Sequence, residues 1–246
     1  MSSLSEATTY AVGTPEEVVD GGFRVAVGEF AYRGRFALVS IAPSPRGGAR
    51  WGAPGTPMLF VTEKAGTLKF IDTASGQIGT VSGVPTVDYG GQGGLGDVAF
   101  LPAEASDSLG NRTIYLSWAE AGEGDTRGAA VGKGKLVCTA PTACAIEGLS
   151  VIWRQTPKVT GRGHYSHRLT FSPDGKYLYV ASGERQKMQP AQDTGATLGK
   201  IVRLNRDGSI PKDNPLVGQT GAAAEIYSLG HRNVQGIVYD AESQRL

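Results

Sequence analysis

The chain has 246 residues, of which 24 are lysine or arginine and 23 are aspartate or glutamate, so its formal net charge is only +1. A balance this close to neutral provides no basic surface for nucleic acid or an anionic membrane, and we expect neither as a partner. The apolar runs are far shorter than the roughly 18 residues that a transmembrane helix needs. The length fits one large all-β domain or two small domains.

The N-terminal residues 1–22 are rich in serine, threonine and glutamate, and we expect them to form a flexible lead-in to a main domain over residues 23–246. The first nine residues lack the basic start and the apolar block of a secretory signal peptide. Taken alone, this start indicates a cytoplasmic protein, although a chain trimmed to its mature form would begin in the same way.

Short segments rich in β-branched and aromatic residues alternate with turns that the 36 glycines mark. Helical periodicity is confined to short turns near Ala103 and Ala191. We therefore predict an all-β fold with strands at residues 36–41, 58–62, 67–72, 97–101, 113–118, 135–138, 151–154, 169–171, 177–181, 200–204, 225–229 and 236–239.

A sandwich, a barrel and a propeller are all compatible with such strands, and one repeat-like hairpin favours the propeller. The segment 171–181 places the turn pair Asp174-Gly175 between two alternating strands, as in a hairpin within a propeller blade. At roughly 40 to 50 residues a blade, the chain holds about four to five blades. Because its last residues lie where a strand pair should be, we expect a propeller that is incomplete in this chain.

The two cysteines, Cys138 and Cys144, lie six residues apart in a loop of threonine, alanine and proline. They could close a small disulfide or remain two free thiols, and the spacing alone does not decide between these states. A zinc site would need more ligands than this segment supplies.

A glycine-rich stretch, Gly91-Gln-Gly-Gly-Leu-Gly96, matches the dinucleotide-binding pattern G-x-G-x-x-G. The residues that follow predict a short strand that ends at Pro102, whereas phosphate binding needs the N-terminus of a helix. The stretch is therefore a turn in which Gln92 is either an exposed side chain or a polar group at a site.

The densest polar clusters lie between residues 161 and 233, which also contain all three histidines. His164 follows two glycines in Gly161-Arg-Gly-His164, and a neutral imidazole is a base suited to neutral pH. Such a base needs a carboxylate on its other ring nitrogen to fix its tautomer, and Glu184 follows the next strand along the chain. The ordinary alternative is a histidine whose hydrogen bonds are satisfied within a turn.

In order and spacing, these motifs resemble the soluble aldose sugar dehydrogenases that use pyrroloquinoline quinone (PQQ), also called glucose/sorbosone dehydrogenases. The resemblance covers residues 35–246 and includes Ala191-Gln-Asp193, Leu198-Gly-Lys200-Ile-Val-Arg203 and Gly230-His-Arg-Asn233. It implies a six-bladed β-propeller in the periplasm or otherwise outside the cytoplasm. It also implies oxidation of an aldose at C1 to a lactone, with electrons passed to an acceptor other than oxygen.

Carried over residue by residue, the resemblance assigns His164 as general base and Glu184 as the group that orients it. It assigns sugar contacts to Gln92, Gly163 and Gln189, and PQQ contacts to Arg232 and Asn233. The family also uses calcium, whose ligands we expect beyond Leu246, so we assign no metal ligand within this chain.

This chain departs from the family pattern at two positions. His167 stands where glycine is usual, and could crowd the site or act as a competing base. Val234 stands where proline is usual.

Two other functions remain open. A non-catalytic or truncated propeller would be a carbohydrate-binding module or an inactive fragment. A related propeller hydrolase, such as a lactonase, would need metal-binding carboxylates that converge on the channel, and the sequence shows none that we recognise. The sugar, the electron acceptor and the oligomeric state are not specified by any motif.

Overall fold

The computed structural model describes residues 11–12, 27–29, 41–43, 58–72, 76–104, 112–140, 142–240 and 242–246. The chain divides into two compact units, Met1–Ala37 and Leu38–Leu246. In the first unit, β1 (Ala11–Val12) pairs with β2 (Val27–Glu29) in an antiparallel arrangement. The other residues of the expected lead-in, 1–10 and 13–22, lie outside the described part of the chain, as do residues 36–40 of the first predicted strand.

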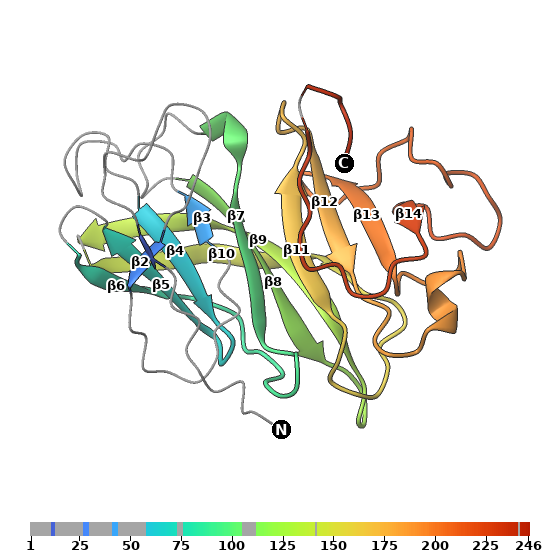
Figure 1. Cartoon of the computed structure of the whole chain (residues 1–246), viewed down its shortest axis with the longest axis horizontal. Coiled ribbons are helices and arrows are strands. Elements are labelled where there is room, and N and C mark those ends of the chain that lie inside the picture. Colours follow the sequence, from blue (N-terminus) through green and yellow to red (C-terminus); the bar gives the residue numbers. More distant parts are fainter. Residues whose placement is uncertain are drawn as a thin grey trace. The chain divides into compact units, whose positions relative to one another are not determined.

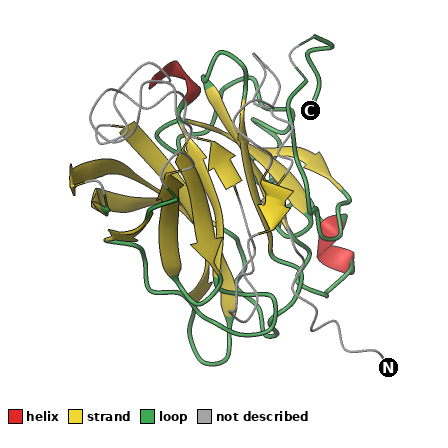
Figure 2. Cartoon of the chain, turned by 60° about the vertical axis from the view of Figure 1, so that its left-hand side comes forward, coloured by secondary structure: helices red, strands yellow, loops and turns green. Residues whose placement is uncertain are grey.

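The second unit consists almost entirely of strands and loops, as Figure 2 shows. This confirms the all-β prediction, and the two helical turns fall near Ala103 and Ala191 as expected. Within the described ranges, no helix is long and apolar enough to cross a membrane. The elements are β3 (Ile41–Pro43), β4 (Met58–Glu63), β5 (Thr67–Asp72), β6 (Ile78–Ser82), β7 (Leu95–Phe100), η2 (Pro102–Glu104), β8 (Arg112–Ala121), β9 (Arg127–Ala140), β10 (Ala143–Arg154), β11 (Ser166–Phe171), β12 (Tyr177–Ser182), η4 (Gln189–Ala191), β13 (Lys200–Asn205) and β14 (Ile226–Leu229).

Three antiparallel meanders of four strands follow one another along the described part of this unit (Figure 1). They are β3–β6, β7–β10 and β11–β14, and in each the strands pair in chain order. A four-stranded meander of this kind is the blade unit of a β-propeller. The first two meanders join into one eight-stranded sheet, because residues 80–82 of β6 pair in parallel with residues 143–145 of β10.

The predicted strands differ from the observed ones most at four places, one of which is β10, because it begins at Ala143 and not at residue 151 as predicted. Strand β6 has no predicted counterpart, because only Val81 among its buried positions carries a large apolar side chain. Strand β9 is far longer than the predicted 135–138. The prediction missed its first part because Gly132 and Gly134 lie there, and the structure places them opposite the large side chains of Trp118 and Ile146. Residues 236–239, predicted as a strand, form none.

Aromatic side chains fill the junctions between the meanders. Phe60 of β4 and Phe100 of β7 stack edge to face with ring centroids 4.8 Å apart, and Tyr115 of β8 meets Phe171 of β11 at 5.0 Å. Removing these rings from water drives the meanders together. Two hydrogen bonds also tie the second meander to the third: Ser117 Oγ donates to the His167 carbonyl at 2.7 Å, and the Leu169 N–H donates to Asp97 Oδ2 at 2.9 Å.

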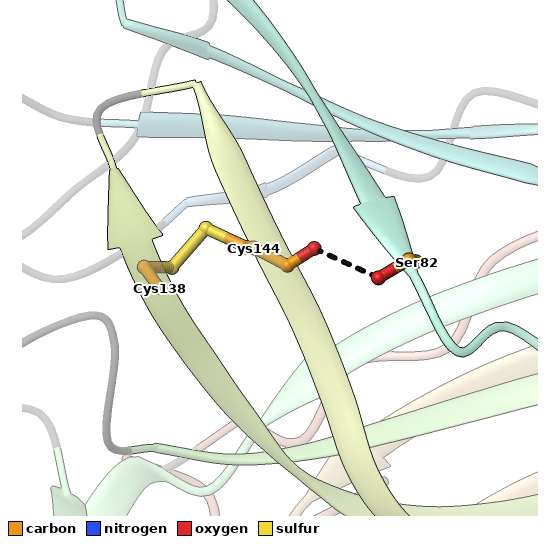
Figure 3. Close-up of a disulfide and its surroundings, with 3 residues drawn as sticks. All are labelled: Ser82, Cys138 and Cys144. Atoms are coloured by element: carbon orange, nitrogen blue, oxygen red, sulfur yellow. Dashed lines mark hydrogen bonds between the residues drawn. A yellow bond between two sulfur atoms is a disulfide. The ribbon is translucent and has the colours of Figure 1, made fainter.

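The two cysteines form a disulfide that links β9 to β10 (Figure 3). Cys138 and Cys144 are direct cross-strand partners, and their Cα atoms lie 4.0 Å apart. Ser82 of β6 donates a hydrogen bond of 3.5 Å to the Cys144 carbonyl, so the disulfide lies where the first two meanders join. Of the two states that the spacing left open, the structure shows the disulfide.

Candidate functional site

The predicted site residues gather at one end of the strands of the second and third meanders. In an antiparallel meander the first strand begins at the same end at which the second strand stops. Gln92 precedes β7, His164 precedes β11, Glu184 follows β12, and Arg232 and Asn233 follow β14. Segments up to about 140 residues apart in sequence are therefore brought together by topology.

His164 and Glu184 form a buried pair. The imidazole Nδ1 is hydrogen-bonded to Oε1 of Glu184, and the two residues are 9% and 1% exposed. Burial alone would raise the pKa of Glu184, but hydrogen bonds from His164 and from the N–H groups of Met188 and Gln186 outweigh it and hold the pKa below its usual range. Because an ionised carboxylate faces Nδ1, the proton of a neutral imidazole lies on Nδ1, and Nε2 is left as an acceptor.

Left-handed backbone conformations cluster around this pair. His164 has a φ of 49°, and Arg185, Gln186 and Met188 have φ values of 60–61°. Each such residue other than glycine costs about 1–3 kcal/mol and persists only where its surroundings fix it. Six of the seven positive-φ residues other than glycine in the described ranges lie in the two segments that carry His164 and Glu184, residues 164–167 and 184–188. Such clustering is typical of functional sites.

Gln92 lies against the loop that carries His164. Its side-chain Oε1 accepts the His164 N–H at 2.7 Å, and its own N–H donates to the Arg162 carbonyl at 2.7 Å. The approach requires a glycine beside it, because a Cβ on Gly91 (φ 54°) would lie 2.5 Å from that carbonyl oxygen. The residue is exposed, and within the described part of the chain its amide nitrogen makes no hydrogen bond, so the nitrogen can still donate to a ligand.

The other two residues expected to contact sugar differ in position. Gly163 is buried, and a Cβ there would lie 2.3 Å from the side-chain oxygen of Gln186. Gln189 is exposed at the start of η4, and no hydrogen bond among the described residues links its side chain to His164. The η4 turn is held by the buried ammonium group of Lys200, which donates to the carbonyls of Pro190 and Ala191 at 2.6 and 3.0 Å.

Arg232 and Asn233 are hydrogen-bonded to the segments that carry the pair, Arg232 through its backbone carbonyl and Asn233 through its side-chain amide. The Arg232 carbonyl accepts the Glu184 N–H at 2.9 Å, while its side chain is exposed and has no partner in the described part of the chain. Asn233 Oδ1 accepts the Ser166 N–H at 3.1 Å, which ties the end of β14 to the start of β11. The structure thus brings Gln92, His164, Glu184, Arg232 and Asn233 together, and leaves Gln189 without a described contact to them.

His167 faces the protein interior rather than the site. It is 2% exposed, stacks on Tyr165 with ring centroids 5.1 Å apart, and lies against Gly96. Burial, followed by the positive charges of Arg185 and Arg168, lowers its pKa to about 3. The ring is therefore neutral at physiological pH and lies apart from the His164–Glu184 pair.

One buried residue at this end of the strands, Arg185, was not predicted from the sequence. Arg185 is 1% exposed and donates hydrogen bonds to backbone carbonyls of the loop that precedes His164. The only signal in the sequence is a charged residue directly after Glu184, and nothing in that pattern specifies carbonyl partners. The described residues contain no group of three or more histidine, cysteine, aspartate or glutamate side chains that could hold a metal ion.

Comparisons with known proteins find relatives of this chain by sequence and by structure. Aldose sugar dehydrogenase YliI of Escherichia coli is 38% identical over 194 residues, which cover 78% of this chain and 50% of that relative. The solved apo structure of the soluble aldose sugar dehydrogenase of E. coli superposes with a TM-score of 0.71 and 35% identity, over 85% of this chain and 55% of the other. For the PQQ-bound aldose sugar dehydrogenase of Streptomyces coelicolor the TM-score is 0.62 and the identity 27%, over 85% and 59%.

The likeness to these solved structures confirms the predicted fold class, and the chain spans about half the length of the curated relative. The model of the glucose/sorbosone dehydrogenase family matches residues 51–246. This match covers every residue of the site described above. The chain therefore belongs to the glucose/sorbosone dehydrogenase family.

Proposed function

We propose that this chain carries the sugar-oxidising site of a PQQ-dependent aldose dehydrogenase, which converts an aldose to its lactone and passes the electrons to an acceptor other than oxygen. The observation that carries the proposal is the buried His164–Glu184 pair, which leaves Nε2 of the imidazole free to accept a proton. The names of the similar proteins, an aldose sugar dehydrogenase and one solved with PQQ, support the same reaction.

In this reaction His164 takes the proton of the C1 hydroxyl on Nε2. Glu184 stabilises the imidazolium that forms, because its carboxylate accepts the hydrogen bond from Nδ1. The second hydrogen leaves C1 with two electrons as a hydride, so that loss of H⁺ and H⁻ gives the C=O bond of the lactone. PQQ, when bound, supplies the electrophilic quinone that takes this hydride.

Arg232 and Asn233 fit one end of the cofactor. PQQ carries three carboxylates and an ortho-quinone, and the exposed Arg232 guanidinium can pair with carboxylate or quinone oxygens in a bidentate manner. The Asn233 oxygen is already used by Ser166, so its amide nitrogen is the group that can reach the cofactor. Among the described residues we assign no calcium ligand.

Sugar contacts are proposed for Gln92, Gly163 and Gln189. The free amide nitrogen of Gln92 can donate to a sugar hydroxyl while its oxygen continues to hold His164.

We also propose that the protein works outside the cytoplasm, where the Cys138–Cys144 disulfide would persist.

The test is a titration of the purified chain with PQQ and Ca²⁺, followed by aldose-dependent dye reduction. We expect saturable PQQ binding, and we expect His164→Ala to lower turnover by about 10²–10⁴-fold while PQQ binding is retained. Near-wild-type turnover in His164→Ala would overturn the assignment of the base. Sugar binding without PQQ binding would instead support the alternative function, a non-catalytic or truncated propeller that binds carbohydrate.

A further inference from the structure

The loop before His164 uses its backbone carbonyls in an unusual way. All four carbonyls of residues 161–164 accept hydrogen bonds from protein groups, although three of these residues are glycine or exposed arginine, and surface loops of this kind usually bond to water. The Gln92 N–H donates a hydrogen bond of 2.7 Å to the Arg162 carbonyl. The other three carbonyls all accept hydrogen bonds from one residue, Arg185.

Arg185 reaches these carbonyls with both its side chain and its backbone. Its Nε donates to the Gly163 carbonyl at 2.9 Å, its Nη2 donates to the Gly161 carbonyl, and its backbone N–H donates to the His164 carbonyl at 3.2 Å. The guanidinium lies 3.7 Å from the centre of the Tyr165 ring. Because a guanidinium is planar and presents its donors in a rigid fork, these contacts fix the path of the loop as well as its position.

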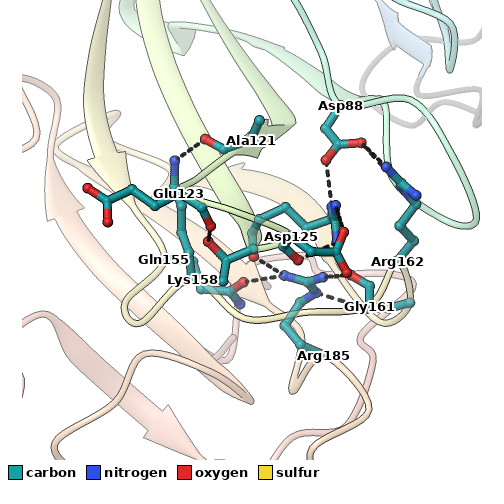
Figure 4. A network of polar contacts seen from close by, with 12 residues as sticks. Asp88, Ala121, Glu123, Asp125, Gln155, Lys158, Gly161, Arg162 and Arg185 are labelled. Atoms are coloured by element: carbon teal, nitrogen blue, oxygen red, sulfur yellow. Dashed lines mark hydrogen bonds and ion pairs between the residues drawn. The ribbon is translucent and has the colours of Figure 1, made fainter.

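The remaining donor of Arg185 connects the loop to the second meander. Nη1 donates to the Arg127 carbonyl at 2.7 Å at the start of β9. Arg127 is itself fixed by Asp88, which accepts its Nε at 2.6 Å and also accepts Nε of Arg162 at 3.2 Å. Figure 4 shows this network, in which the loop is anchored on one side through Arg185 and on the other through Asp88.

We propose that Arg185 is a positioning residue for His164: it holds loop 161–164, in which Gly161 and His164 have left-handed φ values, in the conformation that places the imidazole against Glu184. What His164 does chemically rests on the proposed function, whereas the positioning itself does not. A lysine would not reproduce these contacts, because three different nitrogen atoms of the planar guanidinium reach the carbonyls of residues 127, 161 and 163, whereas an ammonium group donates from one nitrogen.

The alternative is that Arg185 has only a structural role and stabilises the fold. The chain contains a control residue that tests this alternative, Arg112. Arg112 is also 1% exposed, also lies over an aromatic ring (Phe100, 5.0 Å), and also donates to a backbone carbonyl, that of Leu101 at 3.2 Å. Arg112 is the first residue of β8 and lies at the end of the second meander opposite to Gln92, which precedes β7. A general loss from placing lysine at a buried arginine should therefore appear at both positions, and only the change at Arg185 should affect the loop.

The experiment compares Arg185→Lys with Arg112→Lys in the 246-residue chain without cofactor, by amide hydrogen exchange measured with NMR. The reporters are the N–H groups of His164 and Gln92, which belong to the loop contacts but are not bonded to Arg185. We expect Arg185→Lys to speed their exchange at least about tenfold relative to amides of the β12–β13 pair, and to change the ¹⁵N shifts that report the His164 tautomer. Arg112→Lys should change neither readout.

Equal effects of the two variants on the reporter amides would overturn the proposal. If Arg185→Lys does not fold, Arg185→Gln, which keeps a planar donor group without a buried charge, takes its place. Failure of both variants to fold would make Arg185 a structural residue and would also overturn the proposal. Because exchange is measured without cofactor or sugar, a chain that shows the expected exchange but oxidises no sugar would refute the proposed function and leave the positioning role standing.

Discussion

The N–H of His164 donates a hydrogen bond of 2.7 Å to the side-chain oxygen of Gln92, 72 residues earlier in the chain. This bond joins the glycine loop before β7 to the loop before β11. It assigns the two ends of the Gln92 amide to different tasks, since the oxygen holds the loop of His164, and the nitrogen, which has no partner among the described residues, can donate to a ligand.

Replacing Gln92 should separate these two tasks. Gln92→Glu keeps an oxygen for the His164 N–H but removes the amide donor, so we expect the loop to be retained and KM for sugar to rise. Gln92→Ala removes both, and should also lower the free energy of unfolding by about 1–3 kcal/mol because the His164 N–H loses its partner. Denaturant unfolding and steady-state kinetics of both variants test this, and equal stability loss in both would count against it.

Glu184→Gln should leave the side chain in place but remove its charge. We expect turnover to fall by about 10²–10⁴-fold, because a neutral amide does not stabilise the imidazolium of His164.

The pKa of Glu184 is lowered in the folded protein, so its carboxylate stabilises the fold above its unfolded pKa and that stability is lost as pH falls through the folded pKa. Acid unfolding of Glu184→Gln should accordingly be less steep below pH about 4. An unchanged acid limb would contradict the prediction.

Asp97 should give the opposite pH dependence. Burial raises its pKa to about 6, although the N–H groups of Leu169 and Val98 donate to its carboxylate. A raised folded pKa contributes stability below the unfolded value near 3.8, and this stability is lost as pH rises through about 6. Asp97→Asn should remove this pH dependence and lower stability by about 1–3 kcal/mol, since an amide offers one acceptor oxygen to two donors. Urea unfolding between pH 4 and 7 measures both effects, and parallel pH profiles would refute the assignment.

The disulfide should stabilise the fold without acting on the site. Because it closes a loop of six residues, replacing both Cys138 and Cys144 with serine should lower the free energy of unfolding by about 2 kcal/mol. We expect amide exchange at His164 to be unaffected, since the disulfide lies where β9 and β10 turn, at the end of these strands away from the site. Faster exchange at His164 in the double variant would show that the two regions are coupled.

The parts of the fold that were predictable from sequence have strong local signals. Strands such as β12 and β13 carry dense β-branched and aromatic residues, and their positions were found within one or two residues. Strand β9 was shortened in the prediction because Gly132 and Gly134 weaken its local pattern, yet both are accommodated by the large side chains of neighbouring strands. Local propensity fails where packing between strands decides.

For the site, the motifs identified His164 and Glu184, and the structure places them in contact. Their roles in catalysis remain predictions. Arg185 escaped the sequence analysis because its side-chain partners are mainly backbone carbonyls, which every residue possesses and no motif records. The interior position of His167 was also not predictable, since it depends on the space that Gly96 leaves, 71 residues earlier in the chain.

The parallel pairing of β6 with β10 has a consequence for how the molecule opens. An unpaired outer strand offers free N–H and C=O groups to other chains, and here two such edges cover part of each other. Neither meander can then fray from its outer edge without breaking hydrogen bonds to its neighbour. The segment from β3 to β10 should therefore behave as one cooperative unit in partial unfolding.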